Sequence, residues 1–346
     1  MIKVGLVGYG FAGRGFHAYL LGWVPEFQLV AVGTRDPGRR QQAQDDHGVA
    51  TYATLDDMLA QGDVDLVVVA TPHDTHKDLA CQAMDAGKHV VVDKVMCLTT
   101  AEADEMIAAR DRNGVILSVF QNRRWDGDYL TVRRALDAGW LGAPFLFESA
   151  VLSYRPPRGW RGDAGSGGGV LFDWGAHLID QALQLVPGPV TSVTCDIQYR
   201  GWGATIGSYA RLLLRFANGT LFSVEVGNLV RAETPRWRVL GERGALVKNG
   251  LDPQERAMLA GDIASAVEDS VHRARITTDF DGLATELVVE GVRGDWPAYY
   301  RNVAAALTGT TPLAVTPEEA RRGLLIFDAA MAAARTGETI RLAAGS

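Results

Sequence analysis

The residues with the clearest potential for acid–base chemistry are a lysine and a histidine close to carboxylates. Lys94 follows the apolar run HVVVD, so it must reach solvent, a ligand or an ionic partner such as Asp93. Asp173 and His177 are four residues apart, a spacing that places them on one helix face, and Asp180 is three residues further on. A neighbouring carboxylate orients an imidazole and raises its basicity, as a general base for a hydroxyl proton requires. The alternatives are an Asp93–Lys94 ion pair and a solvated helix pair.

A glycine turn stands at the start of the chain. VGLVGYGFAG carries the spacing G-x-G-x-x-G directly between a predicted strand and a predicted helix, and this context is typical of dinucleotide binding. The first glycine allows the tight turn, the second lets the backbone approach a pyrophosphate, and the third packs helix against strand. The alternative is a glycine turn that has lost its cofactor. The cofactor-binding residues expected here are Gly8, Gly10, Phe11, Ala12 and Gly13.

The second predicted strand ends in AVGTRDP, and its tip indicates which dinucleotide binds. Thr34 and Arg35 offer a hydroxyl and a guanidinium, which suit the 2′-phosphate of NADP. Asp36 is the competing candidate, because NAD sites place a carboxylate on the ribose 2′-hydroxyl. We therefore expect NADP to be preferred, with NAD as the alternative cofactor. A solvated surface arginine that binds no cofactor is the alternative for Arg35.

Two more strand ends supply expected cofactor contacts. Ligands bind at the carboxyl ends of the strands in open α/β sheets. The fourth strand ends in VVVATPHDTH, and the fifth ends at the lysine described above. The residues expected to contact the cofactor at these ends are Thr71, Pro72, His73, His76, Asp93 and Lys94. For His76, packing against the following helix is the alternative.

The elements that must position these residues alternate along the first third of the chain. Near-continuous apolar runs such as VDLVVVA indicate strands buried on both faces, and their alternation with amphipathic helices predicts a doubly wound parallel sheet. The predicted strands are Ile2–Val7, Leu29–Gly33, Val64–Ala70, His89–Val92 and Ile116–Phe120. The predicted helices are Phe11–Trp23, Pro37–Asp45, Leu55–Gln61, Thr75–Ala86 and Ala101–Arg112.

The pattern changes after Gln121. Longer strands follow one another from Pro144, with a hairpin signal at Asn218–Thr220, and helices at Pro297–Leu307 and Pro317–Ala334 close the chain. This predicts a Rossmann domain over residues 1–121 and an α+β domain over residues 122–346, with a largely antiparallel, open-faced sheet.

Composition excludes several classes of protein. The chain has 346 residues, 47% of them hydrophobic, and a formal net charge of −7, which argues against a nucleic-acid-binding surface. Cys81, Cys97 and Cys195 are too few and scattered for a disulfide framework, and no third ligand completes a zinc site, so we expect no metal. No apolar run approaches the ~20 residues of a membrane helix, and the first residues carry no leader pattern. A cytoplasmic protein without a membrane partner is expected.

Three segments carry a resemblance to a known family. VGYGFAGRGFHAYLL, ATPHDTHKDLACQAMDAGKHVVVDK and GGVLFDWGAHLIDQAL resemble the Gfo/Idh/MocA family of NAD(P)-dependent oxidoreductases. Within that family, SVFQNRRWDGDYLTVRRAL and LSYRP are most similar to the NADP-dependent scyllo-inositol dehydrogenases. The resemblance implies a Rossmann domain plus an open-faced sheet domain, assembled as homodimers or homotetramers through that sheet.

The resemblance also implies roles for individual residues. The family's catalytic lysine falls on Lys94, and its helix aspartate and histidine fall on Asp173 and His177. The family usually reads Glu-Lys-Pro where this chain has Asp-Lys-Val, and that proline can be cis. A cis peptide is rare before a residue other than proline, so we expect a trans bond between Lys94 and Val95 and a differently held lysine.

The predicted reaction is hydride transfer between NADP(H) and a hydroxyl carbon of a neutral sugar, inositol or other polyol. His177 moves the hydroxyl proton, Lys94 stabilises the developing charge on the same oxygen, and Asp173 binds a neighbouring hydroxyl or orients His177. The residues expected to bind substrate, beside Asp173 and His177, are Asn122, Arg124, Trp125, Tyr154, Arg155 and Trp160. A salt-bridged seam is the alternative for Arg123 and Arg124, and the glycine run at Gly162–Gly169 is a mobile cover or a loop of close backbone approach.

Five arginines near the expected site raise the question of substrate charge. Taken alone, they favour an acidic or phosphorylated sugar. Nearby aspartates can neutralise several of them, and together with the resemblance this predicts a neutral substrate. The arginines are Arg123, Arg124, Arg155, Arg158 and Arg161, and the aspartates are Asp126, Asp128 and Asp163. An NAD-dependent glycosidase of similar fold and a non-catalytic sugar or dinucleotide sensor are the competing functions.

Overall fold

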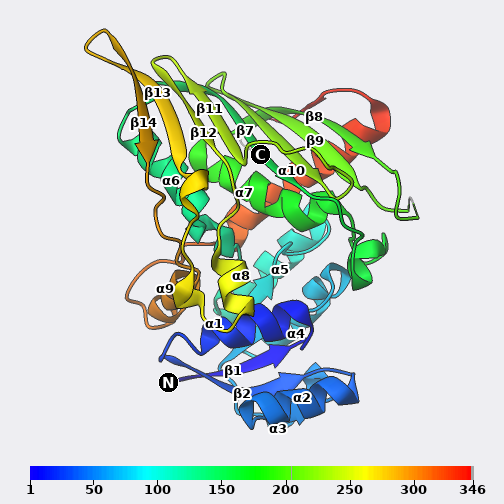
Figure 1. Cartoon of the computed structure of the whole chain (residues 1–346). Helices are drawn as coiled ribbons and strands as arrows, with labels where there is room; N and C mark the ends of the chain where they lie inside the picture. The colour runs from blue at the N-terminus through cyan, green and yellow to red at the C-terminus, as the bar shows by residue number, and fades with distance from the viewer. Residues whose placement is uncertain (204, 344–346) are drawn as a thin grey trace. The chain divides into compact units, whose positions relative to one another are not determined.

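The computed structural model describes residues 1–203 and 205–343, and its contacts divide the chain into two compact units. The first unit comprises Met1–Asn122 and Trp296–Arg321, and the second comprises Arg123–Asp295 and the chain from Arg322 onward. The division near residue 122 lies where the amino-acid pattern changes. The sequence predicts that residues 122–346 form one domain, and the structure differs from this prediction because Trp296–Arg321 packs with the first unit (Figure 1).

The first unit is built on a six-stranded parallel sheet. Its strand order is β3-β2-β1-β4-β5-β6, so the order reverses between β1 and β4, beside the end of β1. Every residue of β4 and β6 is buried, as a sheet covered on both faces requires. The strands are β1 (Ile2–Val7), β2 (Phe27–Gly33), β3 (Ala50–Tyr52), β4 (Leu66–Val69), β5 (His89–Asp93) and β6 (Leu117–Phe120). The predicted doubly wound sheet is confirmed, and β3 is an additional short strand.

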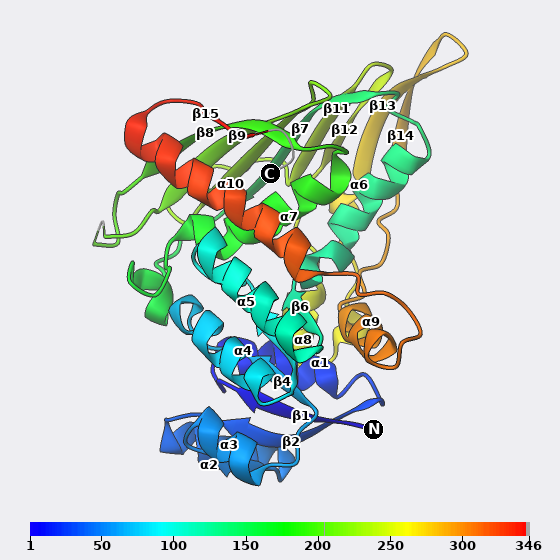
Figure 2. The ribbon, with the colours of Figure 1, turned by 180° about the vertical axis from the view of Figure 1, so that it is seen from behind.

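Helices connect these strands and cover the sheet. The first begins at Phe11 as predicted, is π-helical over Gly13–Ala18 and continues into α1 (Tyr19–Leu21). Figure 1 shows α2 and α3 next to β2, and Figure 2 shows α4 and α5 side by side. The remaining helices of this unit are α2 (Pro37–His47), α3 (Leu55–Gln61), α4 (His76–Asp85), α5 (Thr100–Asn113) and α9 (Pro297–Leu307).

Helix α9 is attached to the parallel sheet through two tyrosines. The hydroxyl of Tyr299 donates a hydrogen bond of 2.9 Å to Ser118 Oγ on β6. The hydroxyl of Tyr300 lies 2.7 Å from Nδ1 of His17, which is fully buried in the helix that follows the glycine turn. Phe120 packs against both tyrosines. These contacts explain why a segment far along the chain belongs to the first unit.

The second unit contains a nine-stranded sheet of order β14-β13-β12-β11-β7-β10-β9-β8-β15. All neighbours are antiparallel except β7 and β10, so the predicted, largely antiparallel sheet is confirmed. Burial alternates along β9, where Leu212 and Leu214 are buried while Arg211 and Arg215 are exposed. The strands are β7 (Pro144–Leu152), β8 (Val190–Gln198), β9 (Tyr209–Phe216), β10 (Leu221–Gly227), β11 (Trp237–Gly241), β12 (Gly244–Lys248), β13 (Ala274–Phe280), β14 (Leu283–Val289) and β15 (Ile340–Arg341).

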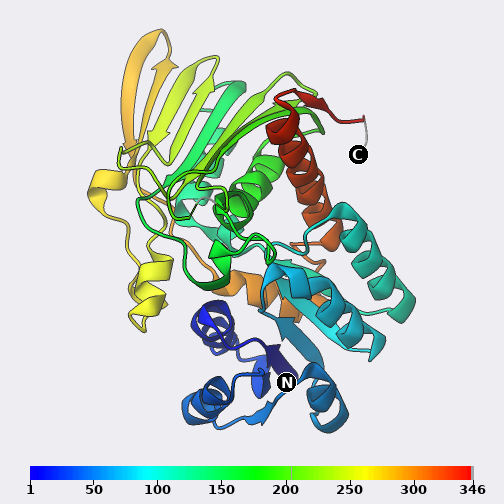
Figure 3. The ribbon, with the colours of Figure 1, turned by 90° about the vertical axis from the view of Figure 1, so that its right-hand side faces the viewer.

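Helices cover one side of this sheet. Figures 2 and 3 show α6, α7 and α10 on the same side, and Phe172 and Phe327 stack there with ring centroids 4.9 Å apart. The helices are α6 (Gly127–Asp137), α7 (Ala176–Leu185), α8 (Gln254–Leu259) and α10 (Pro317–Thr336). Helix α10 belongs to this unit from Arg322 onward. Among the described residues, no helix combines the length and apolar character needed to cross a bilayer.

Candidate active site

The glycine turn has the geometry that its sequence predicts. Gly8 has a φ of +94°, and its N–H donates to the carbonyl of Gly33 at 2.8 Å. A Cβ on Gly8 would lie 2.4 Å from the carbonyl oxygen of Ala70, and one on Gly13 would lie 1.9 Å from that of Gly8. At Gly10 the nearest atom to such a Cβ is Arg39 Nη1, at 3.6 Å. The turn therefore leaves space over Gly10, beside a cation, where a pyrophosphate fits.

The tip of β2 separates the two candidates for the adenosine ribose. The carboxylate of Asp36 caps α2 by accepting from the N–H groups of Gly38 and Arg39, so it already serves the helix. Arg35 is exposed at this tip, and Thr34 is half-buried. Arg39 cannot be identified from the amino-acid sequence, because nothing in the local pattern shows that this helix residue lies close to Gly10.

The segment after β4 lies against the same turn. Thr71 packs on Gly8, and the Thr75 hydroxyl donates to Thr71 Oγ1 and to the carbonyl of Pro72, both at 2.7 Å. His73 is buried, and its ring contacts that of His76 edge-to-face.

His76 does not have the position of a direct cofactor contact. It is fully buried, and its two ring nitrogens lie 2.8 and 2.9 Å from the carbonyl oxygens of Val95 and Thr71. Burial lowers its pKa. The prediction that His76 binds the cofactor is therefore corrected: its ring ties the backbone after β4 to the backbone after β5.

Lys94 stands at the end of β5 and is 9% exposed. The main-chain N–H of Lys94 donates to Asp93 Oδ1 at 2.8 Å, and His17 Nε2 lies 3.8 Å from the same oxygen. Burial alone would raise the pKa of Asp93, but the imidazole of His17 and the ammonium of Lys94 lower it to about 2. The peptide between Lys94 and Val95 is cis, so the expectation of a trans bond is wrong.

The second unit places Asp173 and His177 on consecutive helical turns. Leu171–Gly175 is π-helical and continues into α7, and π turns are frequent at functional sites. Asp173 Oδ1 lies 3.3 Å from Arg161 Nε, and the ring of His177 contacts that of Trp174 with centroids 5.8 Å apart. His177 is 6% exposed, so its side chain is held in a packed environment.

Arg124 is engaged in a structural ion pair. Its Nε and Nη2 donate to the two carboxylate oxygens of Asp180 at 2.8 and 2.7 Å, and both side chains are buried. This geometry corrects two expectations, because Arg124 is not presented to a substrate and Asp180 does not serve His177. The sequence did suggest a salt-bridged seam as the alternative for Arg124.

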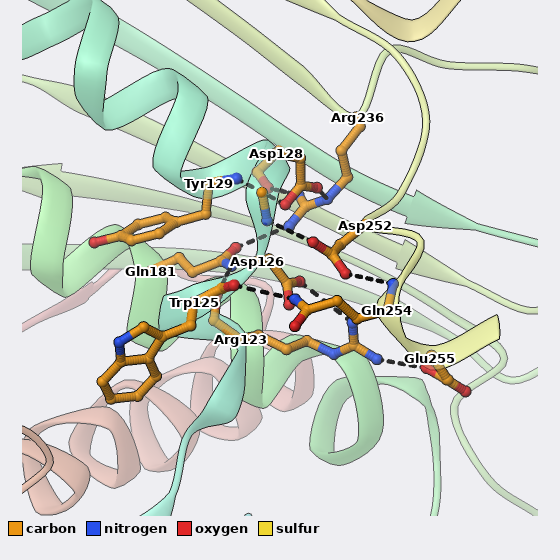
Figure 4. A network of polar contacts seen from close by, with 12 residues as sticks. Arg123, Trp125, Asp126, Asp128, Tyr129, Gln181, Arg236, Asp252, Gln254 and Glu255 are labelled. Carbon is orange, nitrogen blue, oxygen red and sulfur yellow. Dashed lines mark hydrogen bonds and ion pairs between the residues drawn. The ribbon is translucent and has the colours of Figure 1, made fainter. Parts of the chain in front are cut away.

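The other expected substrate residues differ in how they are presented. Asn122 is buried, and Trp125 is half-buried with its indole pointing away from the polar network in Figure 4. Tyr154 is exposed, but Arg231 covers one ring face at 3.7 Å. Arg155 is exposed, and Trp160 is half-buried with the Arg161 guanidinium 4.8 Å from its centroid.

The glycine run forms a loop of close backbone approach. Asp163 accepts from the N–H groups of Gly165 and Ser166, and its own carbonyl accepts from Gly168. A Cβ on Gly168 would lie 2.5 Å from the carbonyl oxygen of Arg161. Asp163 therefore holds its own loop and does not neutralise one of the arginines in these contacts.

The first unit has a parallel sheet with a dinucleotide-binding turn after β1 and a lysine at the end of β5. The second unit has a mixed sheet and a helix that carries a histidine. Together these features define a nucleotide-dependent oxidoreductase of two units. Residues 2–121 match the model of the oxidoreductase family with an NAD-binding Rossmann fold, and residues 129–247 match the GFO/IDH/MocA C-terminal domain. The chain belongs to the GFO/IDH/MocA family and is an NAD(P)-dependent dehydrogenase.

Individual relatives match over the whole length. The chain is 35% identical to the uncharacterized oxidoreductase YdgJ of Escherichia coli (strain K12), over 99% of both chains. It is 32% identical to scyllo-inositol 2-dehydrogenase (NADP(+)) IolW of Bacillus subtilis (strain 168), over 99% of this chain and 96% of IolW. The solved structure of yvaA from Bacillus subtilis matches with a TM-score of 0.92 and 31% identity, over 99% of this chain and 98% of the other.

Proposed function

We propose that this protein transfers a hydride between NADP(H) and a hydroxyl-bearing carbon of a neutral sugar, inositol or other polyol. The observation that carries the proposal is that one chain holds a dinucleotide turn, a lysine at a strand end and a packed helix histidine with a carboxylate four residues before it. A dehydrogenase needs each of them: a place for the cofactor, a cation for the reacting oxygen and an acid–base group.

The preference for NADP is supported by the basic residues around the cofactor turn. Arg35 is exposed at the end of β2, and Arg39 reaches toward Gly10, while the Asp36 carboxylate caps α2. Guanidinium groups bind phosphate through charge-assisted hydrogen bonds. IolW, by its name, uses NADP(+). NAD is the alternative cofactor.

In the proposed mechanism, His177 accepts the proton of the substrate hydroxyl and returns it in the reverse direction. Lys94 donates a hydrogen bond to the reacting oxygen and stabilises the negative charge that develops there. Asp173 binds a neighbouring hydroxyl or orients His177, and Arg161 holds its carboxylate. The nicotinamide, when bound, supplies the hydride acceptor or donor. Gly8, Gly10 and Gly13 would hold its pyrophosphate, with Thr34 and Arg35 at the adenosine ribose.

A neutral substrate is supported by the partners of the arginines. Arg123, Arg124 and Arg161 each have a carboxylate partner within the second unit, so their charge is compensated there. Among the expected substrate residues, Trp160 offers an aromatic surface that suits the apolar face of a sugar ring, and Asp173 offers a carboxylate that suits vicinal hydroxyls.

A cytoplasmic homodimer or homotetramer formed through the nine-stranded sheet is part of the proposal. The helices α6, α7 and α10 lie on one side of that sheet, and the apolar side chains of Phe145 on β7 and Leu213 on β9 are exposed. Size-exclusion chromatography with light scattering tests this assembly, and a monomeric mass would exclude it.

The proposed reaction is tested by measuring absorbance at the reduced-nicotinamide band with a panel of inositols and sugars, each with NADP and with NAD. We expect stoichiometric reduction of NADP with at least one neutral polyol. A glycosidase would release free sugar without net absorbance change. A sensor would bind the dinucleotide or sugar, measurable by calorimetry, without either change.

A further inference from the structure

Arg123 lies against the helical segment that carries His177. Its guanidinium carbon is 4.2 Å from the ring centroid of Trp174, which is the distance of a cation–π contact. The other end of the contact is His177, whose imidazole meets the Trp174 indole edge-to-face at 5.8 Å. Arg123, Trp174 and His177 thus form a continuous packed row, called here the Arg123 row.

Two carboxylates fix the guanidinium of Arg123 in this row. Its Nη2 donates to Glu255 Oε2 at 2.7 Å, and its Nη1 donates to Asp126 Oδ2 at 3.3 Å (Figure 4). Arg123 and Asp126 are buried, whereas Glu255 is partly exposed. A planar guanidinium can present its edges to carboxylates and its face to an aromatic ring at once, and a lysine ammonium cannot.

The main chain of Arg123 is attached to the same helix on the other side of His177. Gln181, four residues after His177 on α7, donates from Nε2 to the carbonyl of Arg123 at 2.9 Å. Arg236 donates to Gln181 Oε1 at 2.8 Å and pairs with Asp128 at 2.8 Å. Arg123 therefore contacts this helical segment at two places. Its side chain contacts Trp174, before His177, and its carbonyl contacts Gln181, after His177.

Asp252 stabilises the start of α8, the helix that carries Glu255. Its carboxylate accepts from the N–H of Gly127 at 2.5 Å and from the N–H of Gln254 at 2.7 Å. The side chain of Gln254 in turn donates to the carbonyl of Trp125 at 3.2 Å. Figure 4 shows how these contacts place the start of α8 next to the turn that holds Arg123. The position of Glu255 is thus set by a buried polar network.

We propose that Arg123 is a positioning residue that sets the plane of the Trp174 indole and, through it, the orientation of the His177 imidazole. The inference rests on the proposed function, in which His177 moves the substrate proton. Arg123 acts on the catalytic histidine through Trp174, so its loss alters the geometry of proton transfer and leaves the proton-transfer group in place. Small misplacements of a catalytic group have large effects on rate.

The test uses nuclear magnetic resonance of the histidine C–H protons in the full-length protein without substrate, at a pH well above the ordinary imidazole pKa. The chain has seven histidines, and His177→Gln identifies the His177 signal. That signal senses the orientation of the neighbouring indole through its ring current. We expect it to move in Arg123→Met and Arg123→Lys, and by less in Glu255→Gln, which removes one of the two anchors.

Matched controls come from an ion pair without an aromatic ring. Arg238 on β11 pairs with Glu148 on β7. Arg238→Lys and Glu148→Gln repeat the same chemical changes away from His177, and we expect the His177 signal to stay in place in both. If Arg123→Met fails to fold, Arg123→Lys and Glu255→Gln still test the proposal, since both retain much of the local charge and volume.

Kinetics supply the second readout. With a polyol that the wild type oxidises, kcat should fall roughly 10–100-fold in Arg123→Lys, while KM for the polyol stays near its wild-type value. An unmoved His177 signal, or full activity of Arg123→Lys, would overturn the positioning role. The resonance measurement needs no turnover. An inactive wild type would therefore count against the proposed function, and the His177 signal would still decide whether Arg123 orients the Trp174 indole and the His177 imidazole.

Discussion

Nη1 of Arg39 lies 3.6 Å from the point that a Cβ atom on Gly10 would occupy. Gly10 is the glycine whose lack of a side chain lets the backbone approach a pyrophosphate. Arg39 thus adds a positive charge next to the N–H groups of the turn, while Arg35 stands at the end of β2. The two arginines are expected to contact different phosphates of one cofactor.

This arrangement predicts different consequences for the two alanine variants. Arg35→Ala should weaken NADP binding about 10–150-fold, the loss of one charged hydrogen bond of ~1.5–3 kcal/mol, and leave NAD binding unchanged. Arg39→Ala should weaken both cofactors, since both carry the pyrophosphate. Titration calorimetry measures the four affinities, with Arg215→Ala on β9 as an exposed control. Unchanged NADP affinity in Arg35→Ala would transfer the ribose contact to Asp36.

Lys94→Met and His177→Ala should each retain the fold and cofactor affinity but lose turnover. Removal of a positioned proton-transfer group typically lowers the rate by ~10²–10⁴. Thermal unfolding curves must accompany the kinetics, because both side chains are mostly buried and their replacement can lower stability. A variant that turns over within a few-fold of the wild type would remove that residue from the mechanism.

The buried pair of Arg124 and Asp180 predicts an effect on stability. Arg124→Met or Asp180→Asn alone leaves one buried charge without its partner, which costs about 3–5 kcal/mol in the free energy of unfolding. The double variant Arg124→Met, Asp180→Leu should recover most of that loss, because an apolar pair of similar volume replaces the ions. Urea unfolding measures all three. A loss in the double variant as large as the sum of the two single losses would mean that the two side chains are not energetically coupled.

The apolar patterns in the sequence predict the parallel sheet well. The bounds of β1 and α9 agree with their predicted ranges, because a buried run and an amphipathic stretch that begins with proline carry their own signal. The strand β3 has only three residues, none of them buried, and β14 alternates exposed with half-buried residues, so neither has a strong apolar pattern.

The site was less predictable where partners are distant in the sequence. Arg124 looks like a substrate ligand until Asp180, 56 residues later, accepts two hydrogen bonds from its guanidinium. The return of α9 to the first unit depends on Tyr299 meeting Ser118, for which no local pattern exists. Residue types and local spacing thus identify candidate chemistry, whereas tertiary contacts decide which side chains are already engaged.

Asp252 should make stability depend on pH in a defined window. Burial raises its pKa from an ordinary value of 3.8 to about 6, and the nearby charge of Asp128 adds to the effect. Between these two values the folded protein binds more protons than the unfolded chain, so the stabilisation present at pH 4 is lost as the pH rises to 6. The shift corresponds to roughly 2–3 kcal/mol.

The variant Asp252→Asn isolates this contribution. Chemical unfolding of wild type and variant across the window gives a difference in which the other titrating groups cancel. The free energy of unfolding of the wild type should fall relative to that of Asp252→Asn as the pH rises. A constant difference would show that Asp252 titrates alike in the folded and unfolded chains.

The most direct test of the central claim compares substrates that differ in charge. With NADP saturating, turnover is measured on inositols and plain sugars, and in parallel on sugar phosphates and uronic acids, at low and high ionic strength. Because Arg123, Arg124 and Arg161 have carboxylate partners, a neutral polyol should turn over, and its apparent affinity should change little with salt. Turnover confined to the anionic sugars, with an affinity that weakens as salt is added, would contradict the account.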